Sequence, residues 1–206
     1  MGRSAKKWRP NLVAQTIEKF LRTNKVTGKI VSVGAGAREW DMLNVSYFRE
    51  SPEKFELVGI NIDPTQLGSY GNFEVIEGDG HAMPFEDASL DGIICNAMLE
   101  HDPQFWLTVA EMQRVVKPGG FVLIGVPGFT GKHLSVVHRL LPGHGAVKND
   151  VREATMTYIV HNAPGDYYRF SEQAMKEVLL GGLESIQMEV VMKPPRVIGW
   201  GVKPKA

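Results

Sequence analysis

Short apolar runs alternate with longer amphipathic segments along most of the chain. Five runs rich in Val, Ile and Leu have the length of strands, and they read as near-continuous apolar stretches. Strands of this kind, separated by helix-length connections, are typical of a parallel sheet that is covered on both faces. The five runs are residues 29–34, 56–62, 72–77, 90–96 and 121–126.

The segments between these runs predict helices. Residues 11–22 have apolar positions at helical spacing, with a proline just outside the segment. A second helix is expected after the first strand, with Trp40, Leu43 and Tyr47 on one face. Both helices would lay an apolar stripe against the sheet.

The clearest helix precedes the fifth strand. Asp102 is suited to cap it, and Pro103 suits its first turn. The run Lys117-Pro118-Gly119-Gly120 ends it. Its apolar stripe is formed by Phe105, Val109, Met112 and Val116.

The pattern becomes irregular after residue 127 and returns near the end of the chain. Ser171 is suited to cap a helix over residues 171–180, and strands are expected at 185–192 and 196–202. The sequence therefore predicts an α/β fold, with a Rossmann-like doubly wound sheet of about seven strands. The sheet is expected to be mostly parallel with an antiparallel C-terminal strand, and residues 1–206 are expected to form a single domain.

Composition narrows the functional classes. The chain has 23 Lys and Arg against 23 Asp and Glu, so no overall charge favours a nucleic acid or a membrane partner. The one cysteine, Cys95, excludes an intramolecular disulfide and a multi-cysteine zinc site, and scattered histidines predict no metal. No stretch has the ~20 apolar residues that span a bilayer, and no signal core is visible, so a cytoplasmic protein is expected.

A glycine loop follows the first predicted strand. Gly34 and Gly36 allow the backbone to approach a ligand closely at the carboxyl end of a strand, which is where open α/β sheets bind ligands. A dinucleotide site would have a third glycine at position 39, which is Glu39. A charged residue there disfavours a pyrophosphate ligand. A ligand that has no phosphate remains compatible with this loop.

Further segments, in order, resemble the class I S-adenosylmethionine-dependent methyltransferases, in particular the group named methyltransferase type 11. The resemblance covers about residues 29–126. Its segments are Ile30-Val31-Ser32-Val33-Gly34-Ala35-Gly36, Val58-Gly59-Ile60-Asn61-Ile62-Asp63-Pro64, Gly78-Asp79-Gly80-His81-Ala82-Met83-Pro84-Phe85, Leu90 to Asn96 with Leu99-Glu100-His101, and Val116-Lys117-Pro118-Gly119-Gly120.

The resemblance implies a binding site for S-adenosylmethionine. In this family the glycine loop packs against the methionine and ribose parts, the end of the second strand grips the ribose, and the next loop binds adenine. Asn61 or Asp63 would hold the ribose, and Asp79 the adenine amino group. The implied cofactor residues are Gly34, Ala35, Gly36, Asn61, Ile62, Asp63, Asp79, Gly80, His81, Asn96, Ala97 and Met98.

Three residues depart from the family pattern. Ser32 replaces an acid, Arg38 replaces a third glycine, and Asn61 replaces the ribose acid. These departures leave an alternative open: a catalytically idle domain of the same fold that binds S-adenosylmethionine, its product or a protein partner.

For an active enzyme, the resemblance implies residues 29–126 as the cofactor-binding core, 127–170 as the cover of the acceptor site, and 171–206 as the C-terminal helix and strands. The expected acceptor is the oxygen or nitrogen of a small molecule. A nucleobase enzyme is disfavoured because Asn96 is followed by Ala97-Met98 rather than by two prolines. His161 is the preferred general base, because it precedes the run Gly165 to Phe170 that resembles a segment of small-molecule enzymes. His101 reads as a packed turn histidine. The acceptor and the oligomeric state stay open.

Overall fold

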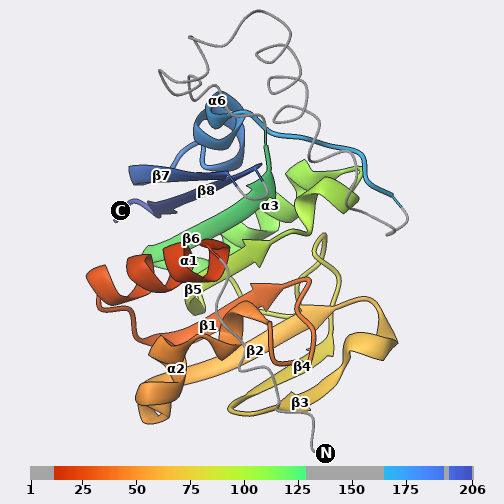
Figure 1. Ribbon diagram of the computed structural model, residues 1–206, viewed down its shortest axis with the longest axis vertical. Coiled ribbons are helices and arrows are strands. Elements are labelled where there is room, and N and C mark those ends of the chain that lie inside the picture. The colour runs from red at the N-terminus through yellow and green to blue at the C-terminus, as the bar shows by residue number, and fades with distance from the viewer. Residues whose placement is uncertain (1–11, 129–164, 193–194, 206) are drawn as a thin grey trace, which may run out of the picture.

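The computed structural model describes residues 12–128, 165–192 and 195–205. These residues build an eight-stranded sheet in the order β3-β4-β2-β1-β5-β6-β8-β7 (Figure 1). The strands are β1 (Gly28–Val33), β2 (Phe55–Asn61), β3 (Gly68–Tyr70), β4 (Phe73–Glu77), β5 (Leu90–Asn96), β6 (Val116–Pro127), β7 (Glu184–Met192) and β8 (Pro195–Val202).

Strand direction agrees with the sequence prediction. β4, β2, β1, β5 and β6 run parallel, β8 is antiparallel to β6, and β7 is antiparallel to β8. The predicted Rossmann-like sheet, mostly parallel with antiparallel pairing at the C-terminal end, is confirmed. The additional strand is β3, a three-residue edge strand antiparallel to β4, which is too short to give a hydrophobic pattern.

Helices cover both faces of the sheet. Successive residues of each strand point to opposite sides, so each central strand packs against both helical layers. Ile30 of β1 packs with α1 (Leu12–Thr23) and α2 (Ser46–Glu50). Its neighbour Val31 packs with α3 (Phe105–Val115) and with α6 (Glu172–Ala174), which continues as a π-helix over Met175–Leu179. This arrangement explains why the central strands are apolar throughout.

The chain between β1 and β2 differs from the prediction. Instead of one helix there is a 3-10 turn at Met42–Asn44 followed by α2, and Val45 between them is extended. The carboxylate of Asp41 caps the turn by accepting a hydrogen bond from the N–H of Leu43. Leu43 is fully buried, but Trp40 is 58% exposed, so the predicted shared helical face was wrong.

The start of α3 also differs. The helix begins at Phe105 rather than beside Asp102, and Gln104 at its N-cap makes no side-chain capping bond. The Asp102 carboxylate accepts hydrogen bonds from the Gln104 N–H at 2.8 Å and from the Thr108 hydroxyl at 2.7 Å. A 3-10 turn at Leu99–His101 separates β5 from this region.

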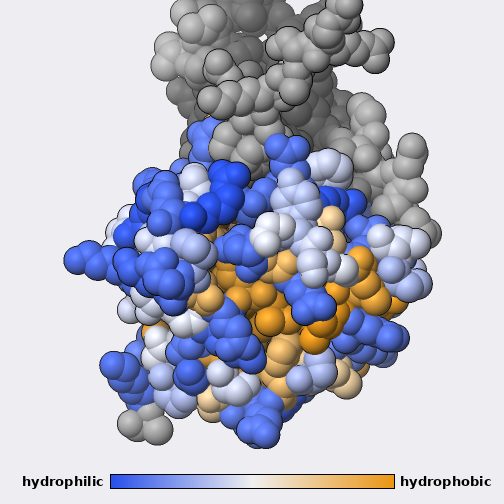
Figure 2. All heavy atoms as spheres, turned by 90° about the horizontal axis from the view of Figure 1, so that it is seen from below, coloured by the Kyte–Doolittle hydropathy of each residue, from blue (hydrophilic) through white to orange (hydrophobic). Residues whose placement is uncertain are grey.

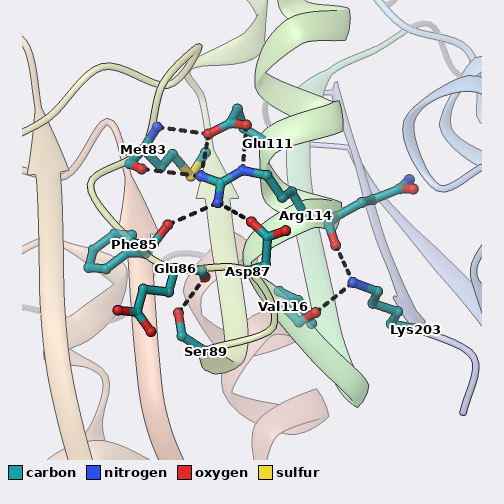
Figure 3. Close-up of polar contacts among 10 residues, drawn as sticks. Met83, Phe85, Glu86, Asp87, Ser89, Glu111, Arg114, Val116 and Lys203 are labelled. Carbon is teal, nitrogen blue, oxygen red and sulfur yellow. Dashed lines mark hydrogen bonds and ion pairs between the residues drawn. The ribbon is translucent and has the colours of Figure 1, made fainter.

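The loop between β4 and β5 is held against α3 by Arg114 (Figure 3). The Arg114 guanidinium donates to the carbonyl of Phe85 at 3.0 Å and to the carboxylates of Asp87 and Glu111 at 2.7 Å. The Glu111 carboxylate also accepts the N–H of Met83 at 2.9 Å. Because these partners span the loop, Arg114 fixes the path of the chain that leaves β4.

The segment before α6 returns to the carboxyl ends of the strands. Phe170 pairs with Gly128 in a parallel bridge, and the Phe170 N–H donates to the carbonyl of Pro127 at 3.0 Å. The N–H groups of Tyr167 and Tyr168 donate to the carbonyl of Glu100 at 2.8 and 3.3 Å. The segment is therefore tied both to β6 and to the turn after β5.

Seen from below, the described surface has an apolar area bordered by hydrophilic residues (Figure 2). Within the described ranges, no helix is both long enough and apolar enough to cross a lipid bilayer.

Candidate functional site

A cavity of about 330 Å³ lies at the carboxyl ends of β1, β2, β4 and β5. This is the edge at which parallel α/β sheets bind ligands, because the loops leaving the strands diverge there. The lining residues come from the four strand ends and from the first turn of α3: Val33, Gly34, Ile60, Asn61, Ile62, Gly78, Asp79, Gly80, His81, Met98, His101, Asp102, Pro103 and Thr108.

The glycine loop forms one wall. Gly34 has a φ of +72°, and a Cβ at this position would lie 2.7 Å from Cγ of Met98. The loop is fixed from behind, since the Gly36 N–H donates to the Asp41 carboxylate at 2.9 Å. Burial raises the pKa of Asp41, and the N–H groups of Leu43 and Gly36 oppose that rise. A residue other than glycine at position 34 would both strain the backbone and collide with Met98, which lines the cavity.

A second, smaller cavity of about 210 Å³ shares Gly34 with the first. Its lining residues include two of the departures from the family pattern, Ser32 and Arg38, together with Asn96 and Ala97. The Asn96 Oδ1 atom is buried and has no hydrogen-bond partner. This atom faces Gly125 of β6, where an added Cβ would lie 2.4 Å from it, so glycine at position 125 leaves the room that the Asn96 side chain occupies.

Asn61 connects the second strand to the glycine loop. Its Nδ2 donates to the carbonyl of Ala35 at 2.6 Å, and its Oδ1 accepts the N–H of Asp63 at 2.9 Å. The Asp63 carboxylate turns away and caps the next turn, where it accepts the N–H and the hydroxyl of Thr65 at 2.9 and 2.7 Å. Asn61 therefore lines the first cavity, and Asp63 lines neither cavity.

The loop after β4 forms the opposite wall. The Asp79 carboxylate accepts the N–H of His81 at 2.9 Å. The His81 Nε2 lies 2.9 and 3.0 Å from the two oxygens of Asp102, and Thr108 donates to the same carboxylate. A Cβ on Gly80 would lie 2.8 Å from the Thr108 hydroxyl oxygen, so the close approach of this loop to α3 requires glycine. The His81–Asp102 contact thus joins two walls of the cavity.

Most of the predicted cofactor residues meet at this place. Gly34, Gly36, Asn61, Ile62, Asp79, Gly80, His81, Asn96, Ala97 and Met98 line one or both of the two cavities. Ala35 is buried in the core. It contributes to the site through its carbonyl, which accepts a hydrogen bond from the Asn61 side chain. The N–H of His81 donates to the Asp79 carboxylate, so it is engaged within the loop itself.

Among the lining residues of the first cavity that sequence reasoning missed are all those that follow Met98: His101, Asp102, Pro103 and Thr108. His101 read as a packed turn histidine, but its side chain is 21% exposed and lies on the cavity wall. The signal that points to it is its position, three residues after Met98 at the end of β5. The preferred base, His161, lies outside the described residues. In the ranges that the structure covers, no group of three or more His, Cys, Asp or Glu is placed to hold a metal ion.

The sequence matches a family model and several named relatives. The family model described as a methyltransferase domain matches residues 33–124. An uncharacterized methyltransferase of Mycobacterium marinum is 30% identical over 58% of the chain and 49% of its own length. A demethylmenaquinone methyltransferase of Bacillus pumilus is 28% identical over 57% of the chain and 50% of its own length. The chain thus spans about half the length of these relatives.

Solved structures agree in fold. A phosphoethanolamine N-methyltransferase 2 of Haemonchus contortus, crystallised with S-adenosyl-L-methionine, superposes with a TM-score of 0.61 at 14% identity. The match covers 94% of this chain and 52% of that protein. At this level of identity the likeness concerns the fold alone, and it extends beyond the segment that the family model matches.

Proposed function

We propose that the protein transfers a methyl group from S-adenosylmethionine to an oxygen or nitrogen atom of a small-molecule acceptor, because residues 33–124 match the methyltransferase domain model. The observation that carries the proposal is the cavity itself. Four strand ends that the family uses for one cofactor converge on it, with Gly34, Asn61, Asp79 and Met98 on its wall.

The adenosine part of the cofactor fits the first cavity. Asn61 has a second Nδ2 hydrogen and a further Oδ1 lone pair for the ribose hydroxyls, beyond its bonds to Ala35 and Asp63. The side chain of Ile62 is 72% exposed at the rim and offers an apolar surface to the adenine ring. Asp79 would accept from the adenine amino group, as the resemblance implies, while Gly80 supplies a backbone N–H.

The methionine part fits the second cavity, on the other side of Gly34. Asp41, whose carboxylate also holds the glycine loop, lies on the wall of this cavity and complements an ammonium group. Arg38 carries a guanidinium on the same wall and complements a carboxylate. Both ends of a zwitterionic amino acid therefore find a complementary group, although Ser32 replaces the family acid.

When bound, the cofactor supplies a methyl group on a sulfonium, which is already activated for displacement. The protein then has to orient the acceptor in line with the carbon–sulfur bond and to exclude water. No metal is needed for this chemistry. The balanced charge of the chain and relatives named for a quinone substrate both support a small-molecule acceptor.

Calorimetry tests the proposal with two matched variants. Asp79→Ala and Asp63→Ala each remove an exposed carboxylate that accepts the N–H of the residue two positions on, at 2.9 Å in both cases. Only Asp79 lines the cavity. We expect micromolar binding of S-adenosylmethionine, at least a tenfold loss in Asp79→Ala, and little change in Asp63→Ala. Equal affinities in all three proteins, or no binding by the parent protein, would reject the site.

Turnover separates the enzyme from the idle domain. We expect release of S-adenosylhomocysteine when the protein is incubated with S-adenosylmethionine and a panel of small hydroxyl and amine compounds. Tight binding of S-adenosylhomocysteine without release across a broad panel would instead favour the idle binding domain of the same fold.

A further inference from the structure

Arg38 places a cation on the wall of the second cavity, and its side chain is half-buried there. Within the described ranges, no residue accepts a hydrogen bond from its guanidinium or forms an ion pair with it. The other half-buried arginines of these ranges each face a carboxylate: Arg114, Arg169 and Arg196. Withdrawal of a charge from water is costly unless an opposite charge compensates it, so Arg38 is suited to an anion that a ligand brings.

The glycine loop holds Arg38 in place. The N–H of Arg38 donates to the carbonyl of Gly36 at 2.7 Å, and the carbonyl of Arg38 accepts the N–H of Asp41 at 3.2 Å. The guanidinium itself lies against the loop, since a Cβ on Gly36 would be 2.7 Å from its Nη2 and 2.8 Å from its Cζ. The side chain therefore folds back along a wall of the cavity, because Gly36 lines the same cavity.

The indole of Trp40 supports the guanidinium. Cζ of Arg38 lies 5.4 Å from the centroid of the Trp40 ring, which is within the range of a cation–π contact. The indole is 58% exposed and lines the same cavity. A contact of this kind holds a guanidinium by its face. The N–H groups lie in the plane of the guanidinium, so they stay directed at a planar anion such as a carboxylate.

Two carboxylates of the protein lie within electrostatic range of Arg38, those of Asp41 and Asp63. Both have other hydrogen-bond partners. Asp41 accepts two backbone N–H groups of its own loop, and Asp63 accepts the N–H and the hydroxyl of Thr65. Asp41 also lines the second cavity, so the wall carries one charge of each sign, as the two ends of an amino acid require. A ligand without a carboxylate would satisfy only one of them.

We infer that Arg38 makes the site specific for ligands that carry the methionine carboxylate, and that Trp40 is its positioning residue; this inference rests on the proposed function. In the methyltransferases that the sequence resembles, position 38 is usually glycine, which has no side chain for this contact. The present chain then selects S-adenosylmethionine and its product over adenosyl compounds that lack the carboxylate.

Two ligands that differ in one group isolate this contact. S-adenosylmethionine and its decarboxylated form share the adenosine, the sulfonium and the ammonium group, and only the first has a carboxylate. In calorimetry we expect the parent protein to bind S-adenosylmethionine about tenfold or more tightly than the decarboxylated form. In Arg38→Met this ratio should fall to about threefold or less, through weaker binding of S-adenosylmethionine.

The outcomes separate this inference from the proposed function. A ratio near one in the parent protein, or an unchanged ratio in Arg38→Met, overturns the role of Arg38. A parent protein that binds neither ligand rejects the proposed function itself. Arg38→Lys keeps the charge without the planar fork, so its ratio should lie between those of the other two proteins. If Arg38→Met does not fold, an unchanged ratio in Arg38→Lys overturns the role instead.

Arg49→Met is the matched control for charge. It removes the same cation from an exposed arginine on α2 that lines neither cavity. The ratio of the two affinities should equal that of the parent protein. An equal fall of the ratio in Arg49→Met and Arg38→Met would assign the effect to the overall charge of the chain and overturn the inference.

Conservative exchange tests the positioning role of Trp40. Trp40→Phe keeps an aromatic face and should keep the ratio, whereas Trp40→Ala should lower it by about two- to fivefold. Binding of the decarboxylated form should stay the same in both variants. Trp40→Ala with the parent ratio overturns the positioning role, and so does an equal loss of affinity for both ligands, which is the result expected of a residue that only stabilises the loop.

Discussion

Asn61→Asp restores the acid that the family usually has at the end of the second strand, and the structure predicts that it harms the protein. The Nδ2 of Asn61 donates to the carbonyl of Ala35 at 2.6 Å, which holds the glycine loop against β2. A carboxylate cannot donate, so the exchange places an anionic oxygen against a carbonyl oxygen. The bond that Oδ1 accepts from the Asp63 N–H is retained.

The magnitude follows from these two bonds. Loss of a donor to a part-buried carbonyl costs about 1–3 kcal/mol, and the retained bond becomes charge-assisted and recovers a fraction of that. We expect a net destabilisation of about 1–2 kcal/mol at pH 7. For a chain of this size the melting temperature should fall by about 2–8 °C.

The pH dependence gives a second signature. The protonated carboxyl can donate its O–H to Ala35, so the fold favours the protonated form and raises the pKa of the introduced group above its unfolded value. Such a group stabilises the fold at low pH, and this contribution is lost as the pH rises through the folded-state pKa. The deficit of Asn61→Asp relative to the parent protein should therefore be largest at neutral pH and shrink as the pH falls.

Calorimetric melting and titration with S-adenosylmethionine check this prediction. Asp63→Asn is the matched control, since it exchanges the same two groups in reverse on an exposed side chain that caps a turn, and its effect should stay below about 0.5 kcal/mol. The reasoning is refuted if Asn61→Asp melts at or above the parent temperature and binds the cofactor at least tenfold more tightly. Asn61 would then be a weak substitute for a ribose acid rather than an anchor of the loop.

Three further outcomes are expected. Gly34→Ala strains a residue with a φ of +72° by about 1–2 kcal/mol and places a Cβ 2.7 Å from Cγ of Met98, so calorimetry should show at least a tenfold weaker cofactor affinity. Arg114→Met should lower the free energy of unfolding by about 1–2 kcal/mol at pH 7. The Arg114 hydrogen bond lowers the pKa of Glu111. The stabilisation is therefore present above the unfolded-state pKa and is lost as the pH falls through the folded-state pKa. Urea unfolding of the variant and the parent protein should show a smaller difference in unfolding free energy at pH 3.5 than at pH 7. Burial raises the pKa of Cys95, so a thiol reagent at pH 8 should react only in denaturant.

The parallel core was predictable because both faces of it are buried. Residues 90–96 read as an apolar run, and β5 spans Leu90–Asn96. Burial on both sides removes the need for alternation, so composition alone marks such a strand. The three-residue β3 has no such signature, since its residues are exposed or half-buried and its pairing depends on β4.

Local hydrogen bonds account for what the pattern could not predict. Trp40 and Leu43 have helical spacing, but the Asp41 carboxylate binds the N–H groups of Gly36 and Leu43 and turns the chain between them. The role of Asp102 was misread in the same way, because its partner His81 is 21 residues away in the sequence. Such contacts exist only after the strand ends have been brought together.

The bridge between Gly128 and Phe170 has a consequence for how this scaffold can be altered. Gly128 and Phe170 flank residues 129–169 and pair with each other, and the N–H of Phe170 also donates to the carbonyl of Pro127 on β6. Loop-closure entropy grows only slowly with length, so a change in the number of residues between 128 and 165 is expected to cost little in folding free energy. Exchange of residues 129–164 between relatives, with Tyr167 and Tyr168 kept, should therefore leave the sheet and the cavity at its carboxyl edge in place.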